Sequence, residues 1–558
     1  MMNRKIYAAA SLLMAALSAS AQVAGTDTAV MAPRVVGVPP SDAYIGLSLL
    51  ETGEIRHYNY GEQAEPGSFY LSSVDKGFTW KRVNTSADIP FADTRSPLSG
   101  EYLRLIAAPR MGTYALRTDG GINGHRTLTK ISDSMAIMLK PPVFIRGGKR
   151  AVVAGHYGLQ PGLPKVCFTF VSDDDGRTWQ QSSFVSTPDH RGGGFHQGIR
   201  WNHGAVEPTV VELKDGRLWM LIRTSQDRHY QSFSHDGGLT WDEATPSPFY
   251  GTITMPTIGR LRDGRLLFLW SNTTPLPEVN QTDGVWDDVF TNRNAIHAAL
   301  SADDGRTWHG FRELYLDPRR DAADFGSASG IDKSVHQSQF VETDPGRVLV
   351  SLGQSARHRV MLIFDVDWLM ARSRYCDFSD SLRQWSVFCY YKGIVGHCGY
   401  NRTPGCALVD GRLQVRYLPN DSLLTSLRGA VWNFPAFRKG RFTASLRFND
   451  LATKGHLLLN DRWFNPTDSV ARHYAPFDVP LSPETLKIRD NKPHLIRIDW
   501  NLDTKHPAAE VYVDNRKRLT VPLRNASQHG LSYVHFLSDT RADDKGYEIE
   551  WVKAEAGR

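Results

Sequence analysis

The chain has 558 residues, a length that excludes a single small module and predicts several domains or one large β architecture. Hydrophobic residues make up 41% and charged residues 22%, close to soluble globular averages, which argues against an integral membrane protein and against a disordered one. The formal net charge of +6 is too weak, and the basic residues are too evenly spread, to predict a nucleic-acid partner.

The first residues of the chain have the features of an export signal. Arg4 and Lys5 supply a basic start, residues 6–17 form a short apolar stretch, and residues 19–21 (Ala-Ser-Ala) form a small-x-small cleavage site. We therefore expect residues 1–21 to be removed and the mature protein to be exported to the periplasm or the cell exterior. No later segment is apolar over the length that a membrane span needs.

One eight-residue pattern, Ser-x-Asp-x-Gly-x-Thr-Trp, occurs four times along the chain. The Asp carboxylate of such a segment can accept hydrogen bonds from turn amides, Gly supplies unusual backbone angles, and Trp can pack beneath the turn. We therefore predict four hairpin turns that belong to the scaffold and not to the chemistry. They are residues 73–80, 172–179, 234–241 and 301–308.

Strand-like runs surround each of these turns, so each repeat predicts a four-stranded unit. The tryptophans of the pattern are 99, 62 and 67 residues apart (179−80, 241−179 and 308−241). The first spacing leaves room for a unit without the pattern, around residues 103–131, and residues 337–367 form a last unit of that kind. Six units predict a six-bladed β-propeller over residues 30–372.

These repeats are Asp-boxes, or BNR repeats, and their arrangement resembles the sialidase (neuraminidase) superfamily of six-bladed propellers over about three fifths of the chain. The resemblance implies a secreted glycoside hydrolase that releases a terminal acidic sugar, either sialic acid or a related ulosonic or uronic acid, from glycans. It implies no metal and no organic cofactor. The partner is thus an acidic glycan, and the sequence predicts no particular oligomeric state.

A second all-β domain is predicted after the boxes stop. Residues 375–558 contain alternating runs such as 440–448 and 494–500, which are typical of half-buried strands. Their order resembles a concanavalin-like jelly-roll β-sandwich. Sugar binding and a purely structural role both stay open for this domain.

Four of the five cysteines lie close together near the start of this second domain. An exported protein can form one or two disulfides there, whereas the alternative is a set of reduced core cysteines. Cys167 lies in an apolar run and is predicted to be a buried free thiol. The four others are Cys376, Cys389, Cys398 and Cys406.

Two charged residues flank one predicted hairpin. Glu207 precedes the strand-like run 209–213, and Arg223 follows the returning run 218–222. The two ends of such a hairpin lie side by side. The resemblance implies that Glu207 polarises the nucleophile and that Arg223 binds the substrate carboxylate. The structural alternative is a surface hairpin with a salt bridge.

A second arginine stands in the next blade, where Arg293 lies eight residues before the serine of the fourth box. Sialidases carry a carboxylate-binding arginine at a comparable place. Two converging guanidinium groups suit a planar carboxylate because each can offer paired donors. Arg223 and Arg293 together therefore predict an acidic ligand.

The chain also departs from the sialidase pattern. Residues 42–46 contain no arginine where the family has its third one, and Arg34 could replace it only if the preceding loop folds over the propeller mouth. The family's acid/base aspartate is not evident, and Glu62 is one of the nearest carboxyl groups. His336 takes the place of the nucleophilic tyrosine, and an imidazole can act as general base or nucleophile near neutral pH.

Two further residues are predicted to line the mouth, namely His203 and Asp332, as wall residues for sugar contact or proton transfer. The changed positions leave two alternatives to a hydrolase open. One is a histidine-based polysaccharide lyase, since His336 and the arginines also suit proton abstraction next to a neutralised carboxylate. The other is a non-catalytic glycan-binding propeller, because fold does not fix function.

Overall fold

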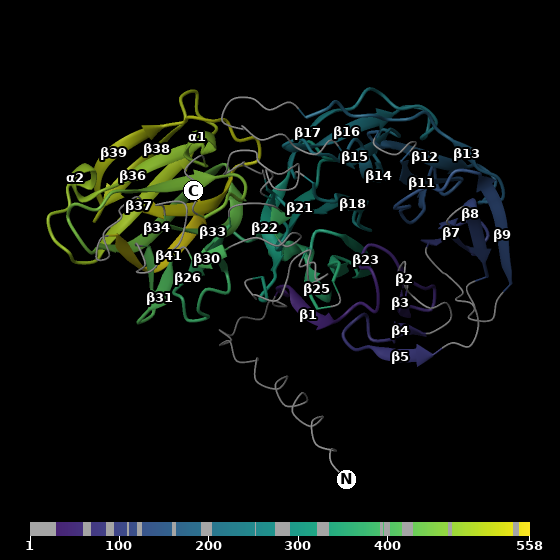
Figure 1. The fold of residues 1–558 in the computed structure, drawn as a ribbon, viewed down its shortest axis with the longest axis horizontal. Coiled ribbons are helices and arrows are strands. Elements are labelled where there is room, and N and C mark those ends of the chain that lie inside the picture. Colours follow the sequence, from purple (N-terminus) through teal and green to yellow (C-terminus); the bar gives the residue numbers. More distant parts are fainter. Residues whose placement is uncertain are drawn as a thin grey trace, which may run out of the picture.

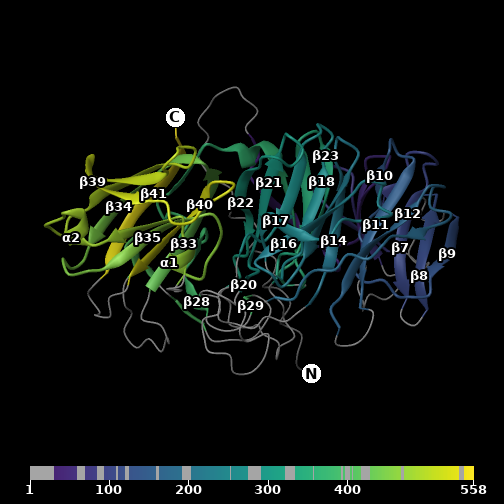
Figure 2. The same cartoon turned by 90° about the horizontal axis from the view of Figure 1, so that it is seen from above.

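The protein is described by a computed structural model. It covers residues 30–59, 69–84, 94–108, 111–119, 125–158, 163–190, 203–251, 253–273, 291–320, 334–355, 357–390, 394–395, 402–404, 406–415, 428–466, 471–538 and 546–557. Two lobes lie side by side, and both consist of strands (Figures 1 and 2). Within these residues no helix is long and apolar enough to cross a bilayer.

The larger lobe contains six four-stranded antiparallel sheets among the described residues, arranged as the blades of a propeller. The first strands of neighbouring blades contact one another, as β14 does with β10 and β18, and so surround the centre. The first three blades are β2 (Leu47–Leu49), β3 (Ile55–Tyr58), β4 (Phe69–Ser73) and β5 (Lys81–Asn84); β6 (Thr94–Arg95), β7 (Tyr102–Ala108), β8 (Gly112–Thr118) and β9 (Arg126–Ser132); and β10 (Val143–Ile145), β11 (Arg150–Tyr157), β12 (Val166–Ser172) and β13 (Gln180–Gln181).

The last three blades continue this order around the ring. They are β14 (Val206–Glu212), β15 (Leu218–Arg223), β16 (Arg228–Ser234) and β17 (Thr245–Tyr250); β18 (Thr257–Arg260), β19 (Leu266–Trp270), β21 (Ala295–Ser301) and β22 (His309–Leu316); and β23 (Ser338–Asp344), β24 (Arg347–Leu352), β25 (Val360–Asp365) and β1 (Arg34–Gly37). The predicted blade without a box near residues 103–131 is the second, and the predicted last unit is the sixth.

The sixth blade is completed by the N-terminal strand of the propeller. β1 pairs antiparallel with β25, so that Arg34 lies opposite Ile363. The main-chain N–H of Met31 also donates to Oδ2 of Asp365 at 2.8 Å, which fastens the start of the propeller to its end. The sixth blade then has four strands like the other five, and each blade keeps only a short outer edge.

The four boxes connect the third and fourth strands of their blades and repeat one set of hydrogen bonds. In the first box, Asp75 accepts from the main-chain N–H and the hydroxyl of Thr79 at 2.9 and 2.6 Å, and Trp80 Nε1 donates to the Gly77 carbonyl at 3.1 Å. Gly77 has a φ of +96°, a conformation that favours glycine. The predicted turn chemistry is present in this box.

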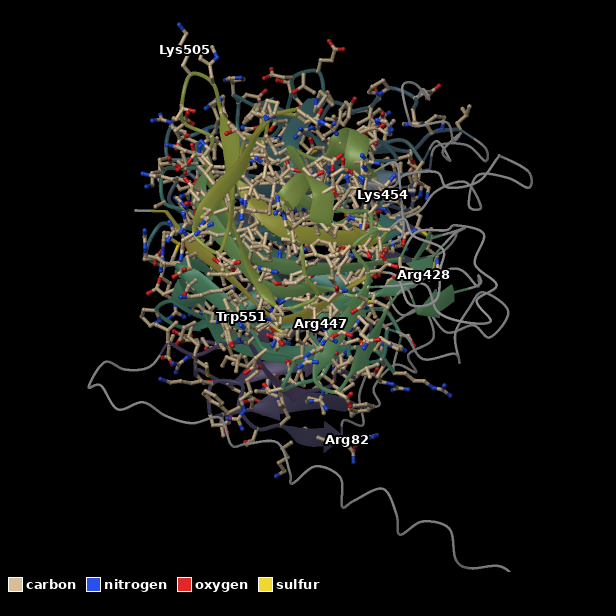
Figure 3. All side chains as sticks on the ribbon, turned by 90° about the vertical axis from the view of Figure 1, so that its left-hand side faces the viewer. Arg82, Arg428, Arg447, Lys454, Lys505 and Trp551 are labelled. Carbon is tan, nitrogen blue, oxygen red and sulfur yellow. The ribbon has the colours of Figure 1, made fainter. Side chains whose placement is uncertain are left out.

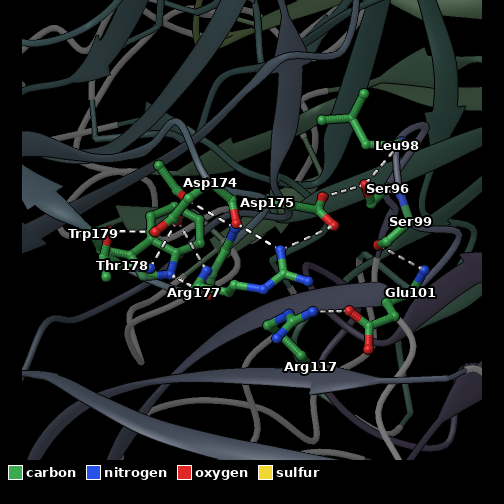
Figure 4. Close-up of polar contacts among 12 residues, drawn as sticks. Ser96, Leu98, Ser99, Glu101, Arg117, Asp174, Asp175, Arg177, Thr178 and Trp179 are labelled. Atoms are coloured by element: carbon green, nitrogen blue, oxygen red, sulfur yellow. Dashed lines mark hydrogen bonds and ion pairs between the residues drawn. The ribbon is translucent and has the colours of Figure 1, made fainter.

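Each box also touches the blade before it. Asp175 of the second box in the third blade accepts from Ser96 of the second blade (Figure 4), and Lys214 of the fourth blade donates its main-chain N–H to Asp304 of the fourth box at 2.8 Å. A Cβ on Gly305 would lie 2.9 Å from the Trp219 ring of the fourth blade. The box therefore forms a turn and also stabilises the contact between neighbouring blades.

The smaller lobe is a sandwich of two antiparallel sheets with an aromatic core between them. One sheet contains β26 (Ser373–Cys376), β31 (Ala407–Val409), β32 (Arg412–Val415), β34 (Lys439–Phe448), β37 (His494–Asn501), β38 (Ala508–Val513), β39 (Arg516–Pro522) and β41 (Tyr547–Ala556). The other contains β27 (Trp385–Ser386), β33 (Arg428–Phe437), β35 (Gly455–Asn460), β36 (Phe477–Leu481) and β40 (Leu531–Ser538). The predicted fold class, an all-β propeller followed by a sandwich, is confirmed.

Short elements join and decorate these sheets. They are the 3-10 helix η2 (Val366–Met370), the helices α1 (Ala471–Tyr474) and α2 (Pro483–Leu486), and the strand pairs β20 (Thr291–Asn292) with β29 (Ile394–Val395) and β28 (Phe388–Tyr390) with β30 (Arg402–Pro404). β26 pairs with β41, so the sandwich includes Ser373, two residues before the predicted start of this domain. Figure 3 views the outer side of the sandwich, where Arg447 donates to Glu548 at 2.6 Å, as expected of a solvent-facing sheet surface.

A buried polar chain connects the two lobes. The main-chain N–H of Asn272 donates to Nδ1 of His297 at 3.0 Å, which leaves the imidazole proton on Nε2. That nitrogen faces the hydroxyl of Tyr533 in the sandwich, and Tyr533 donates to Glu313 of the propeller at 2.8 Å. Burial raises the pKa of the Glu313 carboxyl. The interface is therefore specified by directional bonds and not by apolar contact alone.

The cysteines that the structure describes with their side chains are free thiols. Cys167, Cys376 and Cys406 are all buried, as predicted for Cys167. Burial raises the pKa of the Cys406 thiol. The side chain of Cys389 and the whole of Cys398 lie outside the described residues, so the predicted disulfides stay a prediction for that pair.

Candidate functional site

Glu207 lies at the start of β14, the first strand of the fourth blade, in an unusual backbone conformation. Its φ is +46°, and the pairing of β14 with β15 shifts register between Val206 and Thr209. Such a φ is sparsely populated by residues other than glycine and persists only where neighbouring contacts hold it. Here the main-chain N–H of Glu207 donates to Nδ1 of His156 at 3.2 Å. The bulge places the carboxylate against Arg223 at the end of β15.

The carboxylate of Glu207 forms a buried ion pair with Arg223 at the end of β15. Nη1 of Arg223 donates to Oε1 of Glu207 at 2.8 Å, and the side chains are 8% and 7% exposed. Burial acts to raise the pKa of Glu207, but the charges of Arg223 and Lys140 outweigh it and leave that pKa below its ordinary value. Glu207 is therefore ionised at neutral pH, and the predicted neighbourhood of Glu207 and Arg223 is observed.

Lys165 and His203 form a second hydrogen-bonded pair near this carboxylate. Nζ of Lys165 lies 3.0 Å from Nε2 of His203, and a main-chain bridge between Lys165 and Gly204 fixes the two segments. Burial lowers the pKa of His203 far below its ordinary value, and the charges of Arg223 and Lys165 lower it further. His203 is thus neutral and accepts a hydrogen bond from the Lys165 ammonium.

Arg293 directly follows β20 and is almost fully buried. Its Nε and Nη2 donate to the carbonyl of Ile253 at 3.2 and 2.6 Å, and Val335 donates its main-chain N–H to the Arg293 carbonyl at 2.8 Å. The charge of Arg293 contributes to lowering the pKa of His203, so both belong to one electrostatic environment. The structure thus brings Arg223, Arg293 and His203 together.

His336 is fully buried ahead of β23. The main-chain N–H of Met255 donates to Nδ1 of His336 at 2.9 Å, so the ring carries its proton on Nε2 and presents a donor there. A hydrogen bond from this segment to the Glu207 carboxylate comes from the next residue, since Nε2 of Gln337 donates to Oε1 of Glu207 at 3.5 Å. Gln337 was not among the residues predicted from the sequence.

Of the remaining predicted residues, the structure describes Arg34. Arg34 is exposed on β1, the outermost strand of the sixth blade, whereas the mouth is formed at the opposite edge of the blade by β23. It therefore does not join the basic cluster. Glu62 and Asp332 lie outside the described residues.

Sequence reasoning also missed two lysines of the site. Lys140 precedes β10 and Lys165 precedes β12, and the charge of Glu207 acts on the pKa of both amines. Lys140 stands just before the first strand of its blade, as Glu207 stands at the start of β14, and this equivalent position was the signal that could have found it. In the part of the chain that the structure describes, no three His, Cys, Asp or Glu side chains cluster to hold a metal ion.

Comparison with known families gives one match, to the BNR repeat-like domain over residues 131–350. This match confirms the BNR repeats predicted from the boxes. No curated protein matches the sequence.

Several solved structures are similar in overall arrangement. A sialidase is 13% identical with a TM-score of 0.29; the alignment covers 94% of this chain, which spans about half (52%) of that protein. The Trypanosoma rangeli sialidase is 12% identical with a TM-score of 0.34, and 94% of this chain and 92% of that chain are covered. An α-L-arabinanase of Penicillium chrysogenum, complexed with arabinobiose, is 10% identical with a TM-score of 0.35, covering 61% of this chain and 99% of its own. Similarity at this level carries no information about activity.

Proposed function

We propose that this protein is an exported glycoside hydrolase that releases a terminal acidic sugar, a sialic acid or a related ulosonic or uronic acid, from glycans. The observation that carries the proposal is the buried Glu207–Arg223 pair within a group of basic side chains at one propeller mouth. Partly buried cations favour an anionic ligand. The anion replaces the hydrogen bonds to water that an ammonium or guanidinium group loses on burial. Export and the particular sugar are parts of this proposal.

The state of Glu207 favours a role as base or orienting group and not as acid. Oε1 is engaged by Arg223 and Gln337, whereas Oε2 is buried without a hydrogen-bond partner among the described residues. In hydrolysis the glycosidic C–O bond breaks, the oxygen of water bonds to the anomeric carbon, and a proton of that water passes to a base. The unengaged Oε2 of Glu207 supports that base role. Glu62 stays the sequence-based candidate for the acid that protonates the leaving oxygen.

A lyase is the second candidate, because burial lowers the pKa of the Lys165 amine beside the neutral His203. An amine of this kind can remove the proton next to a carboxylate whose charge the arginines neutralise. The electron pair left on that carbon would then form the C–C double bond as the glycosidic C–O bond breaks, and the leaving oxygen would take up the proton that the amine removed. This mechanism needs no water and leaves an unsaturated uronate.

Product chemistry tests the proposal. Purified protein is incubated with sialylated, ulosonate-bearing and uronate-bearing glycans, and the products are analysed by mass spectrometry and ultraviolet absorbance. A hydrolase releases a saturated monosaccharide, which is heavier than the product of elimination by one water, about 18 Da. Glu207→Gln should abolish this release. An unsaturated product would select the lyase, and tight binding without any product would select a glycan-binding protein.

A further inference from the structure

Lys140 reaches across the start of the fourth blade from its own blade. Its main-chain N–H donates to the Ala154 carbonyl at 2.9 Å, which holds the residue against the third blade. Its Nζ lies 2.8 Å from Sδ of Met255, which precedes the first strand of the fifth blade. Because β14 contacts both β10 and β18, the lysine side chain passes over the end of β14 where Glu207 lies.

The partner of this ammonium is chemically unusual. A thioether sulfur is a weak hydrogen-bond acceptor, whereas Lys165 nearby bonds the good acceptor Nε2 of His203. Oε1 of Glu207 is already engaged by Arg223 and Gln337. Among the residues that the structure describes, the Lys140 ammonium therefore has no hydrogen bond to a carboxylate or carbonyl oxygen.

The Lys140 side chain is partly buried, and a contact with sulfur compensates only weakly for the water that its ammonium has lost. Burial lowers the pKa of Lys140 to about 8, the charge of Glu207 acts to raise it, and the charge of Arg223 lowers it further. At neutral pH the amine is thus mostly protonated. An incoming anion would provide the oxygen acceptor that this group lacks.

We propose that Lys140 is a substrate-binding cation that, together with Arg223 and Arg293, binds the carboxylate of the acidic sugar and exchanges its sulfur contact for a carboxylate oxygen. This inference rests on the proposed function, because it names the group that selects the acidic form of the substrate. Lys140 adds a substrate contact from the third blade, beside the contacts from Arg223 in the fourth blade and Arg293 in the fifth.

The test measures the preference for a carboxylate over its ester. Isothermal titration calorimetry at pH 7 compares N-acetylneuraminic acid and glucuronic acid with their methyl esters, and sodium acetate serves as a carboxylate without a sugar. The variants are Lys140→Met, which keeps side-chain length and packs against Met255, and Lys140→Arg, which restores the charge. Lys149→Met, an exposed lysine of the same blade, is the control.

We expect Lys140→Met to lower the affinity for one acidic sugar by roughly 10- to 100-fold and to leave the affinity for its methyl ester unchanged. Lys140→Arg should regain most of the loss, and Lys149→Met should match the wild type. Melting temperatures are measured first; if Lys140→Met does not fold, Lys140→Gln takes its place.

The outcomes separate this inference from the proposed function. If an acidic sugar binds and Lys140→Met keeps the wild-type preference for acid over ester, the inference is overturned and the function stands. If no acidic sugar binds but acetate does, and Lys140→Met weakens acetate binding, the function is overturned and Lys140 stays an anion ligand. If neither a sugar acid nor acetate binds the wild type, both are overturned.

Discussion

Nη1 of Arg223 lies 2.8 Å from Oε1 of Glu207, and both side chains are buried at the two ends of a single hairpin. A buried ion pair of this kind is held at considerable desolvation cost, so removing one partner leaves an uncompensated charge. The pair consequently has two separable effects, one on folding and one on chemistry. The predictions that follow distinguish them.

Glu207→Gln should lower turnover by orders of magnitude and also reduce the free energy of unfolding by up to about 3–5 kcal/mol, because Arg223 loses its buried counter-charge. Turnover is measured on the glycan that the wild type cleaves, and stability is measured by urea unfolding. Glu243→Gln, an exposed residue of the same blade, should change neither quantity. Full activity in the Glu207 variant would show that this residue takes no part in the reaction.

Arg293→Met should weaken binding of the acidic sugar by about 2–5 kcal/mol, the scale of losing a buried charged partner. It should also destabilise the segment around Ile253, whose carbonyl accepts two of its hydrogen bonds. Arg34→Met is the matched comparison, since Arg34 lies on the outer edge of the sixth blade. Equal losses in the two variants would contradict the placement of the acid-binding site at the mouth.

Stability should fall as the pH is lowered below about 6.5, because several buried histidines stay neutral in the folded protein. Burial lowers the pKa of His57 to about 4 and the pKa values of His156, His229 and His297 to about 3. The unfolded chain takes up these protons near pH 6.5, so it binds more protons than the native state between about pH 4 and 6.5.

Each such histidine should contribute a slope of up to about 1.4 kcal/mol per pH unit within that window. Urea unfolding at pH 7, 6 and 5 measures the combined slope. A variant such as His57→Gln should show a shallower slope than the wild type. Stability that is constant or rises toward pH 5 would contradict the neutral state of these rings.

Tyr533→Phe should reduce the free energy of unfolding by about 1–3 kcal/mol, because Glu313 and His297 both lose a buried hydrogen-bond partner. Calorimetric scanning should then show whether the propeller and the sandwich unfold in separate steps. Tyr512→Phe removes a hydroxyl that donates to Glu510 on the surface of the sandwich and should have little effect. An unchanged melting curve for Tyr533→Phe would mean that the polar chain does not hold the lobes together.

Two glycines of the fifth blade isolate the packing contribution of a box. Gly305 and Gly264 both have a φ of +88°, but a Cβ on Gly305 would lie 2.9 Å from Trp219, whereas Gly264 has no neighbour within 4 Å. Each alanine variant should pay about 1–2 kcal/mol for its backbone conformation, and Gly305→Ala should lose about 1–3 kcal/mol more from overpacking. Equal unfolding free energies in the two variants would show that the box does not press on the preceding blade.

The fold could be predicted because its main signal is local. Each box completes its hydrogen bonds within eight residues, as Asp75 does with Thr79, so the pattern can be recognised without any knowledge of the rest of the chain. The spacing between boxes then predicts the second blade. The pairing of β1 with β25 has no such local signal, so the sequence leaves open whether Arg34 lies in a loop over the mouth, whereas it lies on the outer strand of the sixth blade.

The same distinction explains which parts of the site could be predicted. Glu207 and Arg223 belong to one hairpin, and their spacing alone predicts that they meet. Lys140 and Met255 are brought together only by the curvature of the ring across an intervening blade, and their sequence separation is 115 residues. Contacts of that kind depend on how the blades are placed around the centre, which no short motif encodes.

The pairing of the first and last strands of the propeller also constrains how the protein folds during synthesis. The bond between Met31 and Asp365 joins residues 334 positions apart, so a ribosome must complete nearly all of the propeller before the first strand finds its partner. Until then β1 has no partner strand, and its edge can associate with other chains because long-range strand pairing is slow. A protein that lacks β1 leaves the edge of β25 unpaired and should therefore aggregate during synthesis, even though Glu207, Arg223, Arg293 and all four boxes are intact.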